Sequence, residues 1–252
     1  MAVVFDKPKF LTDTPLHYCP GCTHGIAHRL VAEALEEIGA EKVVGVAPVG
    51  CSVFAYNYFN CDMQQASHGR APSVAQGIKH VTPDSIVFAY QGDGDLASIG
   101  MAEIVHACAR GANITIIFIN NGIYGMTGGQ MAPTTLLGQK ATTCQNGRDP
   151  KVNGRDPKVN GYPIRVCEML KELDGPSFIA RGSLADVRNI KKSKEYLVKA
   201  FQNQKEGKGL SFVELLSTCP TNWHLSPLKA LDYVKNEMTA YYPLGVFKDV
   251  EE

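Results

Sequence analysis

The sequence predicts an α/β domain with a mostly parallel β-sheet flanked by helices. In the middle of the chain, residues 85–90 have the pattern of a strand, residues 99–109 that of a helix, and residues 114–119 are apolar throughout. A strand, a helix and a fully apolar strand in this order are typical of a crossover unit in a parallel sheet. The carboxyl-terminal half repeats this alternation, over residues 177–180, 186–202, 210–217 and 227–241. The whole pattern is that of a single α/β domain.

The amino-terminal part of the chain fits the same class. Residues 23–38 carry apolar side chains at helical spacing, and Gly39 follows them as a stop signal. Residues 42–49 then have the pattern of a short buried strand, and residues 73–80 that of another helix. Residues 1–16 contain two prolines and are expected to form an irregular arm.

The composition excludes several classes of protein. The chain has 25 Lys and Arg and 25 Asp and Glu among 252 residues, of which 44% are hydrophobic. The zero formal charge argues against binding to nucleic acid through a basic surface, and the hydrophobic share argues against disorder. No apolar run approaches the roughly 20 residues that cross a bilayer. No secretory signal is visible, so the eight cysteines are expected in a reducing, cytoplasmic compartment.

Polar residues follow two of the predicted strands at the points where those strands end. Asp93 stands between Gly92 and Gly94, and Asn121 follows the next strand along the chain. Because the carboxyl ends of parallel strands share one edge, Asp93 and Asn121 can face each other there. Carboxylate and amide oxygens suit Mg²⁺, and the amide end of the following helix suits a phosphate. Taken alone, Gly-Asp-Gly would equally fit a turn whose Asp caps a helix.

Four cysteines form a second candidate centre. Cys19 and Cys22 have the two-residue gap that lets two thiolates bind one metal centre. Cys51 and Cys219 each follow a predicted strand, at the sheet edge where Asp93 is also expected. Spacing alone leaves Zn²⁺ and a [4Fe–4S] cluster open. The remaining cysteines lack this setting: Cys61, Cys108, Cys144 and Cys167.

Together these motifs resemble the β subunits of the 2-oxoacid:ferredoxin oxidoreductases, which are thiamine-diphosphate enzymes. The resemblance covers nearly the whole chain. It rests on the segments 18–24 (YCPGCTH), 50–52 (GCS), 68–71 (HGRA), 92–95 (GDGD), 121–130 (NGIYGMTGGQ) and 218–221 (TCPT).

The resemblance implies a role for particular residues. Asp93, the Asn121 side chain and the Ile123 carbonyl would hold Mg²⁺, and His68 would approach the cofactor as a catalytic residue. The residues expected to bind thiamine diphosphate are Gly50, Cys51, Ser52, His68, Gly92, Gly94, Asp95, Asn121, Tyr124 and Thr127. The residues expected to ligate a [4Fe–4S] cluster are Cys19, Cys22, Cys51 and Cys219.

The reaction implied by the resemblance is oxidative decarboxylation of a 2-oxoacid. Coenzyme A would take the acyl group and ferredoxin the electrons. The glutamate that activates the cofactor is expected from an α subunit, because Glu103 lies on the helix after the diphosphate turn. Additional γ and ferredoxin-like δ subunits are expected as well. The chain would therefore be active only with its partners, in a cytoplasmic heteromer.

The substrate and two other functions remain open at this point. Phe54 and Gly128 make one side of the expected pocket apolar and uncharged, which favours 2-oxoisovalerate over 2-oxoglutarate. A non-redox thiamine-diphosphate decarboxylase subunit would not need the four cysteines. A non-catalytic zinc-binding subunit would not need Asp93 and Asn121.

The domain is expected to span residues 1–252, with an extended loop around 140–162. In this loop the heptad Asn-Gly-Arg-Asp-Pro-Lys-Val occurs at 146–152 and again, unchanged, at 153–159. Gly, Asn, Asp and Pro favour a turn, and lengthening an exposed loop costs little free energy. The repeat is therefore interpreted as a tolerated duplication in a protruding loop.

Overall fold

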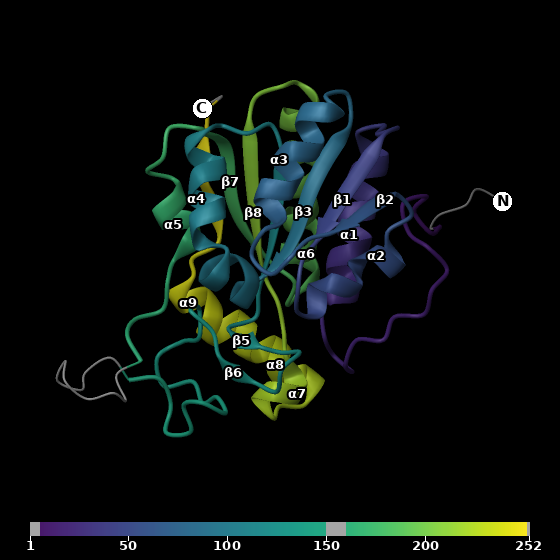
Figure 1. The fold of residues 1–252 in the computed structure, drawn as a ribbon. Coiled ribbons are helices and arrows are strands. Elements are labelled where there is room, and N and C mark those ends of the chain that lie inside the picture. Colours follow the sequence, from purple (N-terminus) through teal and green to yellow (C-terminus); the bar gives the residue numbers. More distant parts are fainter. Residues whose placement is uncertain (1–5, 150–159, 251–252) are drawn as a thin grey trace.

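The computed structural model describes residues 6–149 and 160–250, which form a mostly parallel β-sheet with helices on both faces (Figure 1). The strands of this sheet are β1 (Val43–Ala47), β2 (Asp62–Gln65), β3 (Ile86–Gly92), β4 (Thr115–Asn120), β7 (Pro176–Ser183), β8 (Leu210–Leu216) and β9 (Gly245–Asp249). Their order is β2-β1-β3-β4-β8-β7-β9. Neighbouring strands are parallel, except that β9 pairs antiparallel with β7. The predicted fold class is confirmed.

Helices cover the two faces of the sheet. The helices are α1 (His24–Glu37), α2 (Ala55–Tyr58), α3 (Ala71–Val81), α4 (Met101–Ala109), α5 (Val166–Leu170), α6 (Val187–Lys205), α7 (Pro220–Trp223), α8 (Pro227–Tyr233) and α9 (Thr239–Tyr241). In Figure 1, α3 and α4 lie in front of the sheet and α1 and α6 behind it. Within the described ranges, no helix has the length and apolar character needed to cross a membrane.

The core is divided by the sheet into two layers. Behind the sheet, Leu35 of α1 and Phe201 of α6 pack with Phe88 of β3. In front of it, Ile104 of α4 packs with Phe118 of β4. Because both faces are covered, the apolar side chains of the central strands are fully buried, which explains why these strands have continuous apolar sequences.

The structure differs from the predicted elements mainly at the edges of the sheet. The edge strand β2 has the polar sequence Asp-Met-Gln-Gln and no apolar alternation. Strand β9 forms the opposite edge and pairs antiparallel with β7. It was not predicted, because it is short and directly follows the helical pattern of residues 227–241. The predicted helix at 99–109 starts earlier, with a π-helical turn at Asp95–Ile99 before α4.

An irregular segment runs along the carboxyl edge of the sheet. It begins with the short hairpin of β5 (Ile123–Tyr124) and β6 (Gln130–Met131). In residues 132–149 and 160–165, isolated bridges are the only strand-like pairing. The extended loop predicted around 140–162 overlaps this segment. The second heptad copy, at 153–159, lies outside the described residues.

Candidate functional site

The carboxyl ends of β3 and β4 bring Asp93 and Asn121 together. The two strands are neighbours in the sheet, with Gly92 of β3 opposite Ile119 of β4. The backbone N–H of Ile123 donates both to Asp93 Oδ2 and to Asn121 Oδ1, at 3.2 Å each. Two oxygens that share one donor lie close to each other, so the structure juxtaposes the two predicted side chains although 28 positions separate them in the sequence.

Asp93 is a buried carboxylate with several donors around it. Its side chain accepts hydrogen bonds from the Gly94 N–H at 2.8 Å and from the Thr134 hydroxyl at 2.9 Å. Burial raises the pKa of Asp93 to about 6, and these donors counter part of the rise. A carboxylate, the Asn121 amide oxygen and the nearby Ile123 carbonyl form a donor set that fits a hard divalent cation such as Mg²⁺.

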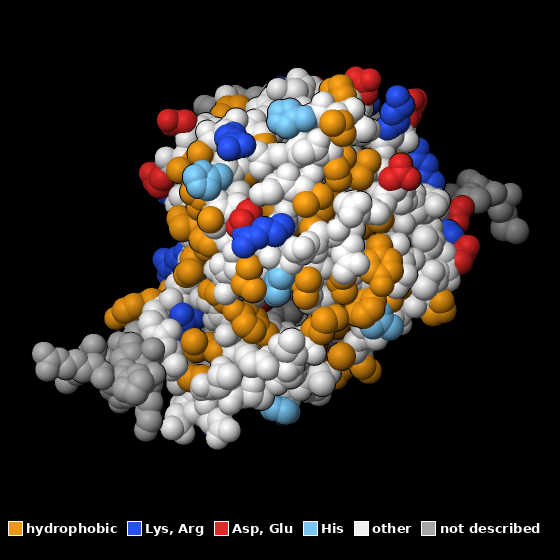
Figure 2. Space-filling view, in the orientation of Figure 1, with side chains coloured by type: hydrophobic (Ala, Val, Ile, Leu, Met, Phe, Trp, Pro, Cys, Tyr) orange, Lys and Arg blue, Asp and Glu red, His pale blue; other side chains and the backbone are white. Residues whose placement is uncertain are grey.

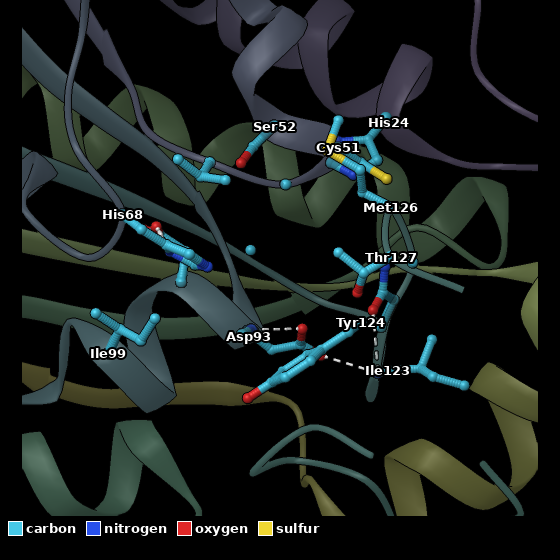
Figure 3. A pocket seen from close by; sticks show the side chains of 17 residues that line it. His24, Cys51, Ser52, His68, Asp93, Ile99, Ile123, Tyr124, Met126 and Thr127 are labelled. Carbon is cyan, nitrogen blue, oxygen red and sulfur yellow. Dashed lines mark hydrogen bonds and ion pairs between the residues drawn. The ribbon is translucent and has the colours of Figure 1, made fainter. Parts of the chain in front are cut away.

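A cavity of about 140 Å³ opens in front of these groups. Figure 3 shows Asp93 and Tyr124 within it, with His68 and Ile99 on one side and Cys51 and His24 on the other. All residues predicted to bind the cofactor line this cavity: Gly50, Cys51, Ser52, His68, Gly92, Gly94, Asp95, Asn121, Tyr124 and Thr127. The structure therefore gathers the predicted residues from four separate segments of the chain.

Two features of the lining indicate a site built for a ligand. The hydroxyl of Ser52 is buried and finds no hydrogen-bond partner among the described residues. A buried hydroxyl without a partner is costly, so a ligand atom at this position would satisfy it. The ring of Tyr124 packs directly on the turn at Gly94, since a Cβ at Gly94 would stand only 2.5 Å from Tyr124 Cε1. Glycine is thus required there by this close approach.

Asp95 orients His68. Its Oδ1 lies 2.5 Å from His68 Nδ1 and accepts from the Gly69 N–H at 2.7 Å. Its Oδ2 accepts from the Gln91 side chain at 2.5 Å. These bonds fix the imidazole through Nδ1 and leave Nε2 for a ligand. Asp95 was predicted to contact the diphosphate, and in the structure its carboxylate is engaged by protein groups.

The four cysteines predicted as ligands line a second cavity, of about 250 Å³. Cys19 and Cys22 lie on a turn closed by the Cys22 N–H and the Cys19 carbonyl at 3.0 Å. A methyl group at Gly125 would stand 3.3 Å from Cys51 Sγ and 3.4 Å from Cys219 Sγ, so the glycine leaves room for both sulfurs. Among the described residues, no three His, Cys, Asp or Glu side chains converge closely enough to hold one metal ion.

Burial disfavours the thiolate form of three of these cysteines, Cys22, Cys51 and Cys219. Burial raises the pKa of Cys22 to about 12 and that of Cys51 to about 11. Burial also raises the pKa of Cys219, although the side chain of Asn222 donates to its sulfur at 3.3 Å and lowers it in part. A metal centre would replace these protons and supply the missing positive charge.

Sequence reasoning missed a buried aromatic layer beneath the cysteines. His28, on the helix predicted at residues 23–38, has a fully buried side chain. His28 Nε2 lies 2.9 Å from the Tyr18 hydroxyl, which also donates to the Cys51 carbonyl at 3.2 Å. Behind them, His24 Nδ1 lies 2.7 Å from the Tyr90 hydroxyl. Tyr18 and His24, the first and last residues of the motif YCPGCTH, are the signal for this layer in the sequence.

Two residues that suggested an apolar substrate pocket lie elsewhere. Phe54 lines the thiol cavity, with its ring 4.3 Å from that of His17. Gly128 does not line the first cavity, and no described residue other than its chain neighbours comes within 4 Å of the place of its Cβ. The apolar part of the first cavity comes instead from Ile99 and Met126, which are about half exposed at its rim.

Comparison with known proteins gives the family. Residues 48–215 match the thiamine pyrophosphate enzyme, C-terminal TPP binding domain. The ketoisovalerate oxidoreductase subunit VorA of Methanothermobacter thermautotrophicus is 47% identical over 98% of this chain and 50% of that protein. The 2-oxoglutarate synthase subunit KorB of Methanocaldococcus jannaschii is 34% identical over 94% of this chain and 89% of that protein. The chain thus spans about half the length of the curated relatives that it matches first.

A solved structure agrees with this assignment at the level of the fold. The 2-oxoglutarate:ferredoxin oxidoreductase of Magnetococcus marinus superimposes with a TM-score of 0.78 and 24% identity, over 97% of this chain and 85% of that one. The fold, the extent of the match and the identities lead to one conclusion. The chain belongs to the thiamine-diphosphate-binding β subunits of the 2-oxoacid:ferredoxin oxidoreductases.

Proposed function

We propose that this chain holds thiamine diphosphate with Mg²⁺ in the first cavity and a [4Fe–4S] cluster in the second. The observation that carries the proposal is that the two cavities adjoin. They share the residues His24, Cys51, Asn121, Gly125 and Met126. A carbon centre in one cavity and an electron acceptor in the other would be separated by little more than the Cys51 and Gly125 segments. This arrangement suits oxidation of a bound substrate.

The thiol cavity favours a cluster over a single zinc ion. Four thiolates around zinc lie about 2.3 Å from one ion and must converge on one point. The four cysteines here line a cavity of about 250 Å³. Among the described residues, no three of their side chains come close enough to bind one ion. A [4Fe–4S] cluster takes one thiolate per iron and fits such a spread. The Asn222 donor to Cys219 Sγ is the kind of contact that adjusts a cluster's potential.

In the first cavity each chain residue has a distinct role. Asp93 and Asn121 would hold Mg²⁺ with the Ile123 carbonyl, and the turn at Gly92 and Gly94 would receive the diphosphate. His68, held through Nδ1 by Asp95, would present Nε2 to the reacting end of the cofactor and substrate. When bound, thiamine diphosphate supplies the carbon nucleophile that lets a 2-oxoacid lose CO₂.

The whole reaction would convert a 2-oxoacid, coenzyme A and two oxidised ferredoxins to acyl-CoA, CO₂, a proton and two reduced ferredoxins. We favour 2-oxoisovalerate, then 2-oxoglutarate. The exposed rim of Ile99 and Met126 is apolar, and the more similar relatives carry the name ketoisovalerate oxidoreductase. In the assembled enzyme, kcat/KM is expected to be at least about tenfold higher for 2-oxoisovalerate than for 2-oxoglutarate. A preference for 2-oxoglutarate would contradict this choice.

The proposal requires partner subunits. Ligand pockets usually measure about 300–1,000 Å³, and the first cavity holds about 140 Å³. No glutamate lines it in the described chain, and Glu103 is instead paired with Arg70. An α subunit would supply the activating glutamate and the rest of the pocket. Further γ and ferredoxin-like δ subunits would carry electrons on to ferredoxin, in the cytoplasm.

The proposal is tested on protein purified without oxygen. Wild type is expected to contain about four irons per chain, to absorb broadly in the visible range and to bind thiamine diphosphate only with Mg²⁺. Two variants separate the cavities. Asp93→Asn is expected to weaken cofactor binding at unchanged iron content. Cys219→Ser is expected to lose iron at unchanged cofactor affinity. One zinc and no iron would overturn the redox function and favour a non-redox subunit.

A further inference from the structure

Arg148, in the first copy of the repeated heptad, is buried and surrounded by backbone carbonyl oxygens. Its side chain is 5% exposed. Within the described part of the chain its N–H groups lie within hydrogen-bonding distance of six acceptors, all of them backbone carbonyl oxygens. The acceptors and distances are Ala132 at 3.3 Å, Pro133 at 2.9 Å, Thr135 at 2.7 Å, Asn160 at 3.2 Å, Gly161 at 2.9 Å and Tyr162 at 2.7 Å.

This guanidinium joins two separate stretches of the irregular segment. Nη1 binds the carbonyls of the turn 132–135, while Nε and Nη2 bind those of residues 160–162. Several carbonyls that point at one place need a donor there, because a buried acceptor without a partner is costly. Only arginine offers five N–H donors in a fixed plane, so lysine cannot replace it at this position.

The turn held by Arg148 is the one that contacts the candidate magnesium site. The Thr134 hydroxyl donates to Asp93 Oδ2 at 2.9 Å. The Thr135 hydroxyl donates at 2.6 Å to the carbonyl of Gly122, the residue after Asn121. Thr134 thus contacts the side chain of Asp93 directly, and Thr135 holds the backbone of the residue after Asn121. Arg148 fixes the backbone of these consecutive threonines through the Thr135 carbonyl.

We propose that Arg148 is a positioning residue for the magnesium–diphosphate site. It holds the turn 132–135 so that Thr134 and Thr135 keep Asp93 and the Asn121-Gly122 turn in place. The inference rests on the proposed function, because it takes the cation and diphosphate to bind at Asp93 and Asn121. It assigns a role in the site to the first heptad copy and is consistent with the second copy being a tolerated duplicate.

The repeat supplies a matched control. Arg155 occupies the same place in the second heptad copy and lies outside the described residues. Because the two copies are identical, the second one could take the place of the first in a variant that lacks Arg148. The comparison is therefore made between Arg155→Ala and the double variant Arg148→Ala/Arg155→Ala.

The measurement is the Kd of thiamine diphosphate with Mg²⁺, by titration calorimetry, at a temperature where circular dichroism shows each variant folded. Arg155→Ala is expected to bind as wild type does. The double variant is expected to bind about 10–100-fold more weakly, as is usual when a group that orients a metal ligand is lost. An equal Kd in both variants would overturn the inference, even if the double variant melts at a lower temperature.

Two further variants keep the test decisive. If the double variant does not fold, Arg148→Lys/Arg155→Ala replaces it and is expected to weaken binding in the same direction. Thr134→Val removes the hydroxyl that donates to Asp93. If Arg148 acts through Thr134, the losses of binding free energy caused by Thr134→Val and by removal of Arg148 should be less than additive. Full additivity would exclude action through Thr134. Failure of wild type to bind the cofactor would instead refute the proposed function.

Discussion

Arg181 on β7 is the largest side chain that is fully buried, and it has two carboxylate partners. Its Nε donates to Glu214 Oε2 at 2.8 Å, and its Nη2 donates to Glu168 at 2.6 Å. Glu214 is also fully buried and accepts from the Asn120 side chain at 2.7 Å. Asn120 precedes Asn121, so this chain of contacts leads from the core to the candidate magnesium site.

Removing the charge of Arg181 should be strongly destabilising. In Arg181→Met, Glu214 stays buried without its counter-charge, and we expect the free energy of unfolding to fall by about 3–5 kcal/mol. The measurement is urea denaturation followed by circular dichroism. The matched variant Arg181→Met/Glu214→Gln removes both charges and should recover part of the loss. A double variant no more stable than the single one would contradict this explanation.

At the scale of elements, helix α6 begins with a well-formed N-cap. Asp186 accepts from the Asn189 N–H at 2.9 Å and from the Asn189 side chain at 2.7 Å. The helix packs on α1 and on strands β7 and β8, so its start also fixes one layer of the fold. The hydrogen bond from the Asn189 N–H lowers the pKa of Asp186, and its side-chain amide contributes to the shift.

Asp186→Ala should therefore cost about 1 kcal/mol of stability at neutral pH. Because the pKa of Asp186 is lower in the folded state, the cap makes its full contribution to stability at pH values above the pKa of Asp186 in the unfolded chain. This contribution is lost as the pH falls through the folded-state value. Asp186→Asn should keep the cap and lose this pH dependence. The check is thermal unfolding of the three proteins between neutral and acidic pH, and parallel pH profiles for Asp and Asn would contradict it.

One copy of the repeated heptad can be deleted without changing the sequence of the other. Removal of residues 146–152 gives the same sequence as removal of 153–159, and one Asn-Gly-Arg remains to occupy the place of Arg148. The flanks lie close, because Arg148 donates to Asn160 and Gly161. The remaining Pro-Lys-Val can span roughly 10 Å, enough to join them.

The deletion should change the free energy of unfolding by less than about 1 kcal/mol, because shortening a loop changes its closure entropy little. Activity of the assembled enzyme and cofactor affinity should stay near wild-type values. Chemical denaturation and calorimetry provide the check. A marked loss of affinity would show that the second copy has a role of its own.

At the scale of the whole molecule, both cavities lie at one edge of the sheet. Hydrophobic side chains cover much of the middle of the face shown in Figure 2, and few charged side chains lie among them. Ile99 and Met126, at the rim of the first cavity, are 49% and 44% exposed. An apolar rim around a cavity that is too small for its cofactor is typical of a site completed by another subunit.

The chain by itself should therefore bind cofactor and cluster without oxidising any 2-oxoacid. We expect no reduction of ferredoxin or a dye by the purified chain with coenzyme A and 2-oxoisovalerate. Activity should appear when the remaining subunits are co-expressed. The iron content of the isolated chain serves as the control for an intact preparation, and substantial activity of the isolated chain would refute the need for an α subunit.

The sequence by itself determined the central crossover units and the place of the site. Continuous apolar runs identify strands that are covered on both faces, and parallel strands end at a common edge. Asp93, Asn121, Cys51 and Cys219 each follow such a strand, so local pattern and topology suffice to bring them together. The polar edge strand β2 lacks this pattern and was missed for the same reason.

Only the tertiary structure decided which partners these residues take. Asp95 binds His68 across 27 positions, and Thr134 binds Asp93 across 41. The burial of His28 likewise depends on the rings of Phe59 and Tyr90, which lie far from it in the sequence. Hydrogen bonds of side chains depend on packing distances and directions that periodicity does not encode. The sequence therefore specifies the edge of the sheet where the site lies, and packing specifies how each group in it is held.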